Sequence, residues 1–195
     1  MFVKICGMTD EGAVEASVAA GADAVGFVFF HKSPRNLTPA AAATLASGLP
    51  DTVRKVAVML HPDGTLWEEV QRALRPDILQ TDLADFACLE VDPAIEKWPV
   101  LREGSLPGEL PDTFVYEGRM SGKGQSVDWE VAADIAKRGR MILAGGLNAL
   151  NVSDAIARVR PWGVDVSSAV ESAPGIKDAG RISEFVAAAK AVTRE

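Results

Sequence analysis

Short apolar runs rich in Val, Ile, Leu and Phe recur along the whole chain. The eight runs begin at Val3, Ala24, Val53, Asp77, Pro99, Thr113, Met141 and Gly163. Each has the length of a β-strand, and several are apolar at odd and even positions alike. Strands of that kind are buried on both faces, as in a parallel sheet covered by helices. The pattern therefore predicts a parallel sheet, with helices in the intervening segments.

Most of the intervening segments carry helical signals. Val14 and Val18 lie four residues apart before Gly21, a residue suited to the left-handed end of a helix. Thr38 and Pro39 form an N-cap followed by proline at the first helical position. The last segment has the clearest amphipathic stripe, made of Ile182, Phe185, Val186, Ala189 and Val192.

Three further helix starts are expected from capping residues. Thr65 and Glu68 fit a capping box, Ser126 can cap a helix that ends at Gly139, and Asn148 can cap the helix after it. The stretch from Leu83 to Pro111 is weaker. The fourth helix, Leu83 to Val91, is short, and "REGSLPGELP" leaves little room for a fifth, so that helix is expected to be degenerate or replaced by a loop.

Strand and helix alternate with no segment left over, so the pattern predicts one (β/α)₈ barrel domain over residues 1–195. This is near the lower limit of roughly 200 residues for the fold. A doubly wound open sheet is the alternative.

Charge and cysteine content narrow the possible functions. The net charge is −7, and no run of Lys or Arg indicates binding to nucleic acid or acidic lipid, so we expect a small-molecule enzyme or binding protein. Cys6 and Cys88 do not make a disulfide framework and are interpreted as reduced thiols in a cytoplasmic protein. Neither a signal peptide nor a membrane span is expected.

In a barrel of this kind the reactive groups come from the carboxyl ends of the strands and the loops that follow them. The polar or turn-forming residues there are Cys6, His31, Lys32, Arg35, Asp82, Glu117, Gly145, Gly146, Asp165, Ser167 and Ser168. His31 and His61 lack metal-ligand spacing and are expected to be surface or capping residues. A buried thiol such as Cys6 can equally be a small core residue.

Two glycine- or serine-bearing turns follow adjacent strands, one at Gly145–Gly146 and one at Ser167–Ser168. Their N–H groups can hold a phosphate, although such glycines can also serve only the turn. Arg35 can bind a carboxylate through two hydrogen bonds, or can simply be solvated. The loop from Gly118 to Lys123 lacks the spacing of a P-loop and is interpreted as a possible lid.

The motifs "VKICGMT", "GADAVGFVF", "SPRNLTP", "LAGGLNALNV" and "GVDVSSAVE" followed by "PGIKD" run in this order from Val3 to Asp178. Together they resemble the phosphoribosylanthranilate isomerase family of tryptophan biosynthesis. The resemblance implies a (β/α)₈ barrel that needs no cofactor or metal. The implied reaction is the Amadori rearrangement of N-(5-phosphoribosyl)anthranilate to 1-(2-carboxyphenylamino)-1-deoxyribulose 5-phosphate.

The resemblance also implies roles for individual residues. Cys6 matches the family's general base, and Glu117 stands where the family has an aspartate as general acid. We expect positive or N–H-rich surroundings to shift Cys6 toward thiolate, and burial to hold Glu117 partly protonated. The extra methylene of glutamate moves the carboxyl by roughly 1 Å, a displacement that can cost about a hundredfold in rate unless the backbone compensates, which we expect.

The remaining site follows in the same way. Arg35 matches the residue that holds the anthranilate carboxylate, the turns at Gly145–Gly146 and Ser167–Ser168 match the phosphate site, and Asp165 matches an aspartate near the sugar hydroxyls. Two further departures are "LQTDLAD" in place of a "QLHG" motif, which removes a histidine there, and Ala169 in place of glycine, which is expected to narrow the phosphate turn slightly.

Two other functions remain open at this point. One is a related isomerase of histidine biosynthesis, although such an enzyme would carry aspartate where this chain has Cys6. Indole-glycerol-phosphate synthase is not favoured, because it would need a lysine and glutamate pair that we cannot place. A non-catalytic barrel that binds a phosphate ligand is the alternative from a different class. In each case the expected partner is a small phosphosugar, with no nucleic acid or membrane, and the protein is a monomer or a homodimer.

Overall fold

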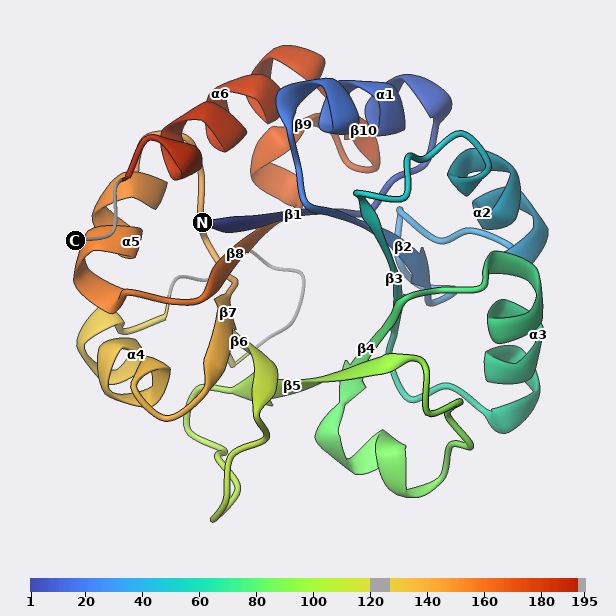
Figure 1. Ribbon diagram of the computed structural model, residues 1–195, viewed down its shortest axis with the longest axis horizontal. Helices are drawn as coiled ribbons and strands as arrows, with labels where there is room; N and C mark the ends of the chain where they lie inside the picture. Colours follow the sequence, from blue (N-terminus) through green and yellow to red (C-terminus); the bar gives the residue numbers. More distant parts are fainter. Residues whose placement is uncertain (120–126, 193–195) are drawn as a thin grey trace.

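Eight parallel strands close into a barrel in which each strand pairs with the next and β8 pairs with β1 (Figure 1). The computed structural model describes residues 1–119 and 127–192. The strands are β1 (Phe2–Cys6), β2 (Ala24–Phe29), β3 (Arg54–Met59), β4 (Ile78–Asp82), β5 (Glu96–Arg102), β6 (Thr113–Glu117), β7 (Arg140–Leu143) and β8 (Gly163–Val166). The predicted (β/α)₈ barrel is confirmed, and the open sheet is wrong.

Alternate side chains along each strand point into the barrel or out toward the helices. The inner apolar cluster consists of Ala24, Val56, Ile78, Trp98, Val100, Val115, Ile142 and Ala144. Outward neighbours such as Val25, Leu79 and Leu101 belong to a second cluster between the sheet and the helices. Burial on both faces explains why several strands are apolar at both parities.

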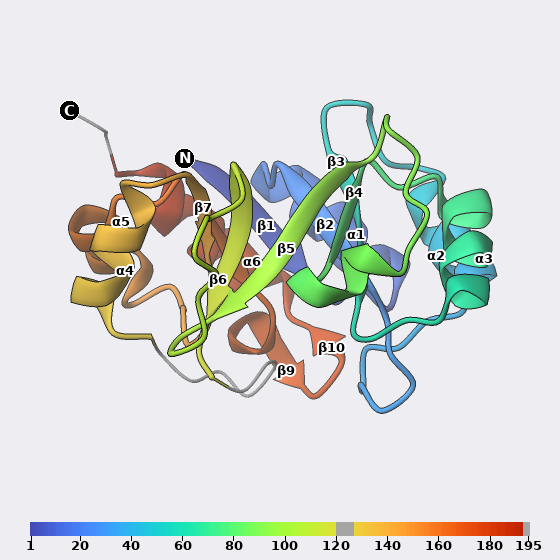
Figure 2. The same cartoon turned by 90° about the horizontal axis from the view of Figure 1, so that it is seen from below.

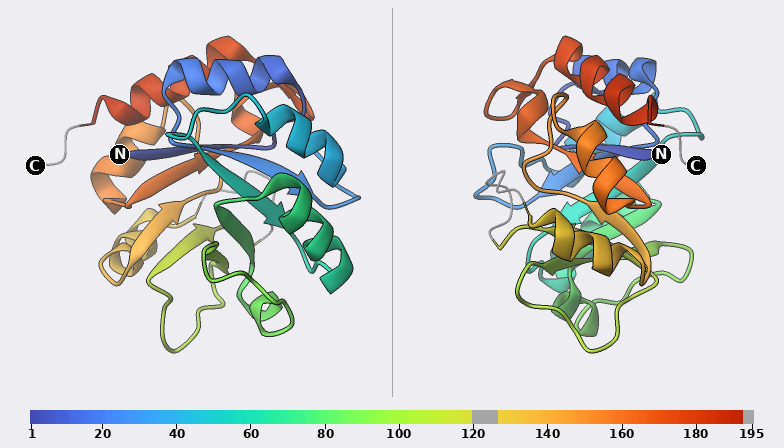
Figure 3. Two further views of the ribbon diagram at one scale, coloured as in Figure 1. Left: turned by 45° about the vertical axis from the view of Figure 1, so that its right-hand side comes forward. Right: turned by 90° about the vertical axis from the view of Figure 1, so that its left-hand side faces the viewer.

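The helices form an outer ring around the strands (Figure 3). They are α1 (Glu11–Ala20), α2 (Pro39–Ala46), α3 (Gly64–Leu74), α4 (Trp129–Ala136), α5 (Val152–Val159) and α6 (Ala179–Lys190), with 3₁₀ turns η1 (Leu83–Ala87) and η2 (Ser168–Val170). The short fourth helix is η1, and a loop without helix joins β5 to β6, which confirms the degenerate fifth helix. Within residues 1–119 and 127–192, no helix is long and apolar enough to cross a membrane.

The helix ends agree with the capping signals in part. Thr38 caps α2 by accepting from the Ala41 N–H at 3.2 Å, and Gly21 ends α1 with φ of 85°. The capping box at Thr65 is wrong, because α3 begins at Gly64 and Asp63 accepts from the Leu66 N–H at 2.7 Å. Aspartate is an N-cap at least as good as threonine, so the earlier carboxylate takes the position.

Two other helix starts also differ from the expectation. The N-cap of α5 is Asn151, while the Asn148 side chain accepts from two N–H groups in the turn before the helix. The N-cap of α4 is Asp128, whose carboxylate accepts from the N–H groups of the first turn. The expected cap Ser126 lies outside the described residues.

A short antiparallel ribbon of β9 (Glu171–Ala173) and β10 (Ile176–Lys177) follows β8 and η2. Figure 2 shows this ribbon at one end of the barrel, outside the ring of strands. Gly175 lies in the connecting turn with φ of 82°, a conformation that favours glycine. The ribbon was not predicted, since strands this short carry no measurable periodicity.

Candidate active site

A cavity of about 660 Å³ opens at the carboxyl ends of the strands. This volume is in the usual range for a small-molecule site. All the predicted site residues line the cavity, namely Cys6, Arg35, Glu117, Gly145, Gly146, Asp165, Ser167 and Ser168. The structure therefore brings together residues from the ends of five different strands and the loops that follow them.

Cys6 shares the inner face of β1 with a lysine. Lys4 lies two residues earlier and is fully buried, and its Nζ is 2.9 Å from Oδ1 of Asp165, its register partner on β8. Gly26 on β2 leaves room for both side chains, because a Cβ there would lie 3.1 Å from Cys6 Sγ and 3.2 Å from Lys4 Cε. Cys6, Lys4 and Asp165 thus form one buried polar group, of which Cys6 and Asp165 line the cavity.

The charge states in this group follow from burial and contact. Burial raises the pKa of the Cys6 thiol, and the nearby Lys4 ammonium opposes that rise without cancelling it. Burial lowers the pKa of Lys4, but Asp165 and Cys6 outweigh burial and raise it above its usual value. Lys4 therefore stays charged. The expectation that the surroundings shift Cys6 toward thiolate is wrong for this state of the site, because desolvation exceeds the effect of the cation.

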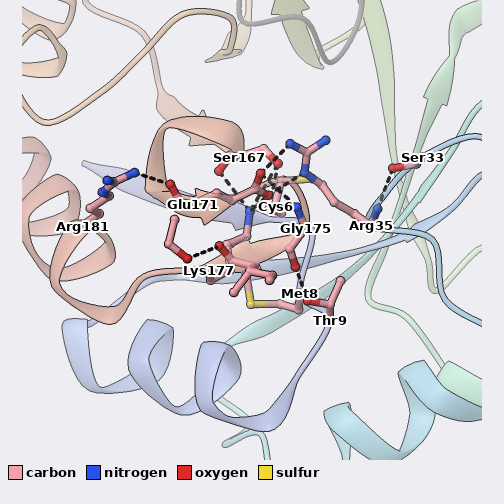
Figure 4. A network of polar contacts seen from close by, with 12 residues as sticks. Cys6, Met8, Thr9, Ser33, Arg35, Ser167, Glu171, Gly175, Lys177 and Arg181 are labelled. Atoms are coloured by element: carbon pink, nitrogen blue, oxygen red, sulfur yellow. Dashed lines mark hydrogen bonds and ion pairs between the residues drawn. The ribbon is translucent and has the colours of Figure 1, made fainter.

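Arg35 is held by a carboxylate of the β9–β10 ribbon (Figure 4). Its Nε and Nη2 donate to the two carboxylate oxygens of Glu171 at 2.6 and 2.8 Å. Lys177, the register partner of Glu171, donates to the same carboxylate at 2.8 Å. Burial raises the pKa of Glu171, but these two cations outweigh burial and lower it. The ribbon therefore fixes the position of the Arg35 guanidinium at the rim of the cavity.

Neither Glu171 nor Lys177 was predicted as part of the site. Their opposite charges flank the Pro174–Gly175 turn, and cross-strand pairs of opposite charge stabilise a hairpin. This spacing is the signal that the sequence offers. Gly7, directly after Cys6, is a second such signal. Its φ of 84° favours glycine, and a Cβ added at this residue would lie only 2.5 Å from Cδ of Arg35. A side chain at residue 7 would displace Arg35.

The two predicted phosphate turns follow the paired strands β7 and β8. Gly145 and Gly146 have φ of 90° and 67°, and the Asn151 amide fixes their turn by donating to the Gly146 carbonyl at 2.9 Å. The Ser167 hydroxyl donates to the Cys6 carbonyl at 3.0 Å, so it ties this turn to β1. Ala169 lies within η2, a conformation that alanine adopts without strain. The backbone therefore gives no reason for the expected narrowing of the phosphate turn at this residue.

Glu117 ends β6 and is mostly buried, with its Oε1 3.4 Å from Nε of Arg102 on β5. The same guanidinium lies 2.7 Å from Asp82, the residue that replaces the expected motif histidine. Arg102 therefore lies between the Glu117 and Asp82 carboxylates at the cavity wall, and the expectation that Glu117 is partly protonated stays a prediction. Residues 120–123 of the expected lid lie outside the described residues, while Gly118 lines the cavity.

Gln80 is a further polar residue that sequence reasoning missed. It is buried on β4 and lines the cavity, and within the described chain its Oε1 accepts no hydrogen bond. Buried polar atoms are nearly always hydrogen-bonded, so an unpaired one in a cavity wall is a position for a polar ligand group.

His61 is largely exposed, and its ring lies 3.6 Å from Asp82 and 3.0 Å from Asp85.

The closed barrel and a cavity at its carboxyl end, lined by a buried thiol, a carboxylate and an anchored arginine, define a TIM-barrel enzyme with a small-molecule site. Residues 3–188 match the family model described as N-(5′-phosphoribosyl)anthranilate isomerase. The chain belongs to this family.

Individual relatives agree with the family assignment. The chain is 41% identical over 202 residues to the N-(5′-phosphoribosyl)anthranilate isomerase of Thiobacillus denitrificans, covering 97% of this chain and 98% of the relative. The crystal structure of TrpF from Jonesia denitrificans aligns with a TM-score of 0.83 at 33% identity, over 97% of each chain. A phosphoribosyl anthranilate isomerase in complex with reduced 1-(o-carboxyphenylamino)-1-deoxyribulose 5-phosphate aligns with a TM-score of 0.79 at 30% identity, over 98% of this chain and 100% of that one.

Proposed function

We propose that this protein catalyses the rearrangement of N-(5-phosphoribosyl)anthranilate in tryptophan biosynthesis, with Glu117 as general acid and Cys6 as general base. The observation that carries the proposal is the convergence of the predicted residues on one cavity in a chain of this family. The histidine-pathway reaction and the non-catalytic barrel have no comparable support, since the family model covers residues 3–188.

The proposal assigns one proton transfer to each of these two groups. Glu117 gives its proton to the furanose ring oxygen, and the C–O bond breaks as the ring opens to a Schiff base. The thiolate form of Cys6, which burial disfavours and the Lys4 ammonium favours, then takes the proton from the adjacent sugar carbon, and the enolamine that results tautomerises to the ketone. Lys4 supplies a positive charge beside the sulfur, while Arg102 faces the carboxylate that Glu117 becomes.

The anionic ends of the substrate are assigned to the two sides of the rim. The Gly145–Gly146 and Ser167–Ser168 turns hold the phosphate through N–H and hydroxyl groups, and Asp165 accepts from a sugar hydroxyl. Arg35 uses Nε and Nη2 for Glu171, so its Nη1 edge binds the anthranilate carboxylate. In this arrangement Glu171 orients the arginine and the arginine binds the substrate.

The proposal is tested by turnover of freshly generated phosphoribosylanthranilate. We expect wild-type turnover, and we expect Glu117→Gln to lower kcat by about 10²–10⁴-fold, the usual contribution of a general acid. Glu117→Asp serves as the matched variant that keeps the acid and should retain more activity than Glu117→Gln. Binding of a product analogue without any wild-type turnover would support the non-catalytic barrel, and full activity in Glu117→Gln would refute Glu117 as the acid.

Arg35→Met is expected to raise KM by about tenfold or more with a smaller change in kcat, because a charge-assisted hydrogen bond to the substrate is lost. Glu171 keeps its contact with Lys177 in this variant, so the ribbon stays paired. Arg35→Lys retains the charge but not the planar fork and should give an intermediate KM. An unchanged KM in Arg35→Met would remove this residue from substrate binding.

A further inference from the structure

One arginine joins two carboxylates across three consecutive strands of the barrel. Arg102 at the end of β5 lies 2.7 Å from Asp82 on β4 and 3.4 Å from Glu117 on β6. Arg102 and Glu117 are register partners, and all three side chains line the cavity. We propose that Arg102 is the positioning residue for the Glu117 carboxyl and that Asp82 anchors it. This inference rests on the proposed role of Glu117 as general acid.

The two contacts of the guanidinium differ in length. The shorter contact, from Nη2 to Oδ1 of Asp82, is an ion pair that holds the guanidinium beside the end of β4. The longer contact, from Nε to Glu117, limits where the carboxyl lies without holding it in a tight ion pair. A glutamate has one more rotatable bond than an aspartate, so it depends more on such a neighbour for its position. Arg102 supplies that restraint from the adjacent strand.

Glu117 and Asp82 are two of the positions at which this chain departs from the motifs that the resemblance implies, one as glutamate for aspartate and one within "QTD". Because both contact Arg102, the two departures are one structural feature rather than two. The longer acid and the new carboxylate on β4 are therefore explained together by the arginine between them.

The charges around Glu117 give this feature an electrostatic signature. Arg102 favours the ionised carboxylate, and Asp82 offsets part of the arginine's charge. On the far side of Asp82 lie His61, at 3.6 Å, and Asp85, which His61 contacts. On the other side of β6, the residue after β7 is the apolar Ala144, whose N–H donates to the carbonyl of Tyr116, so it brings no side-chain charge to Glu117. Removing the cation or the anion should therefore shift the titration of Glu117 in opposite directions.

The experiment uses Arg102→Gln, Arg102→Lys and Asp82→Asn in the full chain, with kinetics and carbon-13 NMR of labelled glutamate carboxyls. Comparison with Glu117→Gln assigns the Glu117 signal. We expect its titration midpoint to rise in Arg102→Gln and to fall in Asp82→Asn. We expect kcat to fall by about 10–100-fold in Arg102→Gln, as for a misplaced catalytic group, with little change in KM. Arg102→Lys should restore the midpoint more fully than kcat.

Arg54→Gln is the matched control. Arg54 is the first residue of β3, at the opposite end of the barrel from the cavity, and its guanidinium lies 2.6 Å from the Glu96 carboxylate. This control variant should change neither the Glu117 titration nor kcat. A rise in KM at unchanged kcat in Arg102→Gln would overturn the inference and make Arg102 a substrate ligand, and an unmoved midpoint would also overturn it. If the Glu117 midpoint shifts in opposite directions in Arg102→Gln and Asp82→Asn but the wild type shows no turnover, the coupling of Arg102 to Glu117 is supported and the proposed reaction is refuted.

Discussion

Cys6→Ala is expected to lower kcat by about three orders of magnitude, within the usual 10²–10⁴-fold contribution of a general base. The thiol is the group at the end of β1 that faces the cavity, beside the buried Lys4 ammonium. Alanine removes the proton acceptor while filling most of the same space, and it leaves the Lys4–Asp165 pair in place. The loss should therefore appear in turnover and not in the fold.

Cys88→Ala is the natural control for this variant. Cys88 is the second free cysteine of the chain and is exposed, whereas Cys6 is buried in the cavity floor. Steady-state kinetics and urea denaturation on both variants separate the two explanations for any loss. Near-normal turnover in Cys6→Ala would refute the thiol as the base, and equal losses in the two variants would point to a general effect of cysteine removal.

The barrel was predictable because its signal is local. Burial on both faces of the strands leaves apolar residues at both parities, and the bounds of β2 and β6 agree with the apolar runs that begin at Ala24 and Thr113. The start of α3 was wrong for a local reason too, since Asp63 and Thr65 are both good caps and the sequence does not say which the chain uses.

The contacts that define the site were less predictable, because they depend on the register of the closed barrel. Lys4 meets Asp165 across 161 positions of sequence, and only the pairing of β1 with β8 brings them together. The contact of Arg102 with Asp82 depends in the same way on the register of β4 and β5. The alternation in "VKIC" does place Lys4 on the face of Cys6, but the degree of burial, which decides the pKa of the thiol, is a property of the whole fold.

Lys4→Met is expected to lower the free energy of unfolding by about 3–5 kcal/mol at pH 7, the usual cost of removing one partner of a buried ion pair. Lys4 is fully buried and Asp165 nearly so, with 2.9 Å between their charged atoms. Methionine keeps the length and packing of the side chain but leaves a carboxylate buried without its cation. Urea denaturation of the variant and the wild type measures the difference.

The pH dependence of that loss distinguishes charge from packing. Burial raises the pKa of Asp165, and without Lys4 nothing from β1 opposes the rise. An acid whose pKa is higher in the folded state stabilises the fold fully below its unfolded pKa of about 3.9. That contribution is lost as the pH rises through the folded pKa. The deficit of Lys4→Met relative to wild type should therefore be small near pH 4 and grow toward pH 7.

The double variant Lys4→Met with Asp165→Leu completes the test, because it removes both charges and leaves two apolar side chains of suitable size. Replacing a buried ion pair by well-packed apolar residues is often neutral or stabilising, so this variant should recover most of the stability lost in Lys4→Met. Its stability should also depend less on pH than that of the single variant. A deficit that is equal at pH 4 and pH 7 would show that Lys4 serves packing, and the buried charge beside Cys6 would then have no part in the stability of the site.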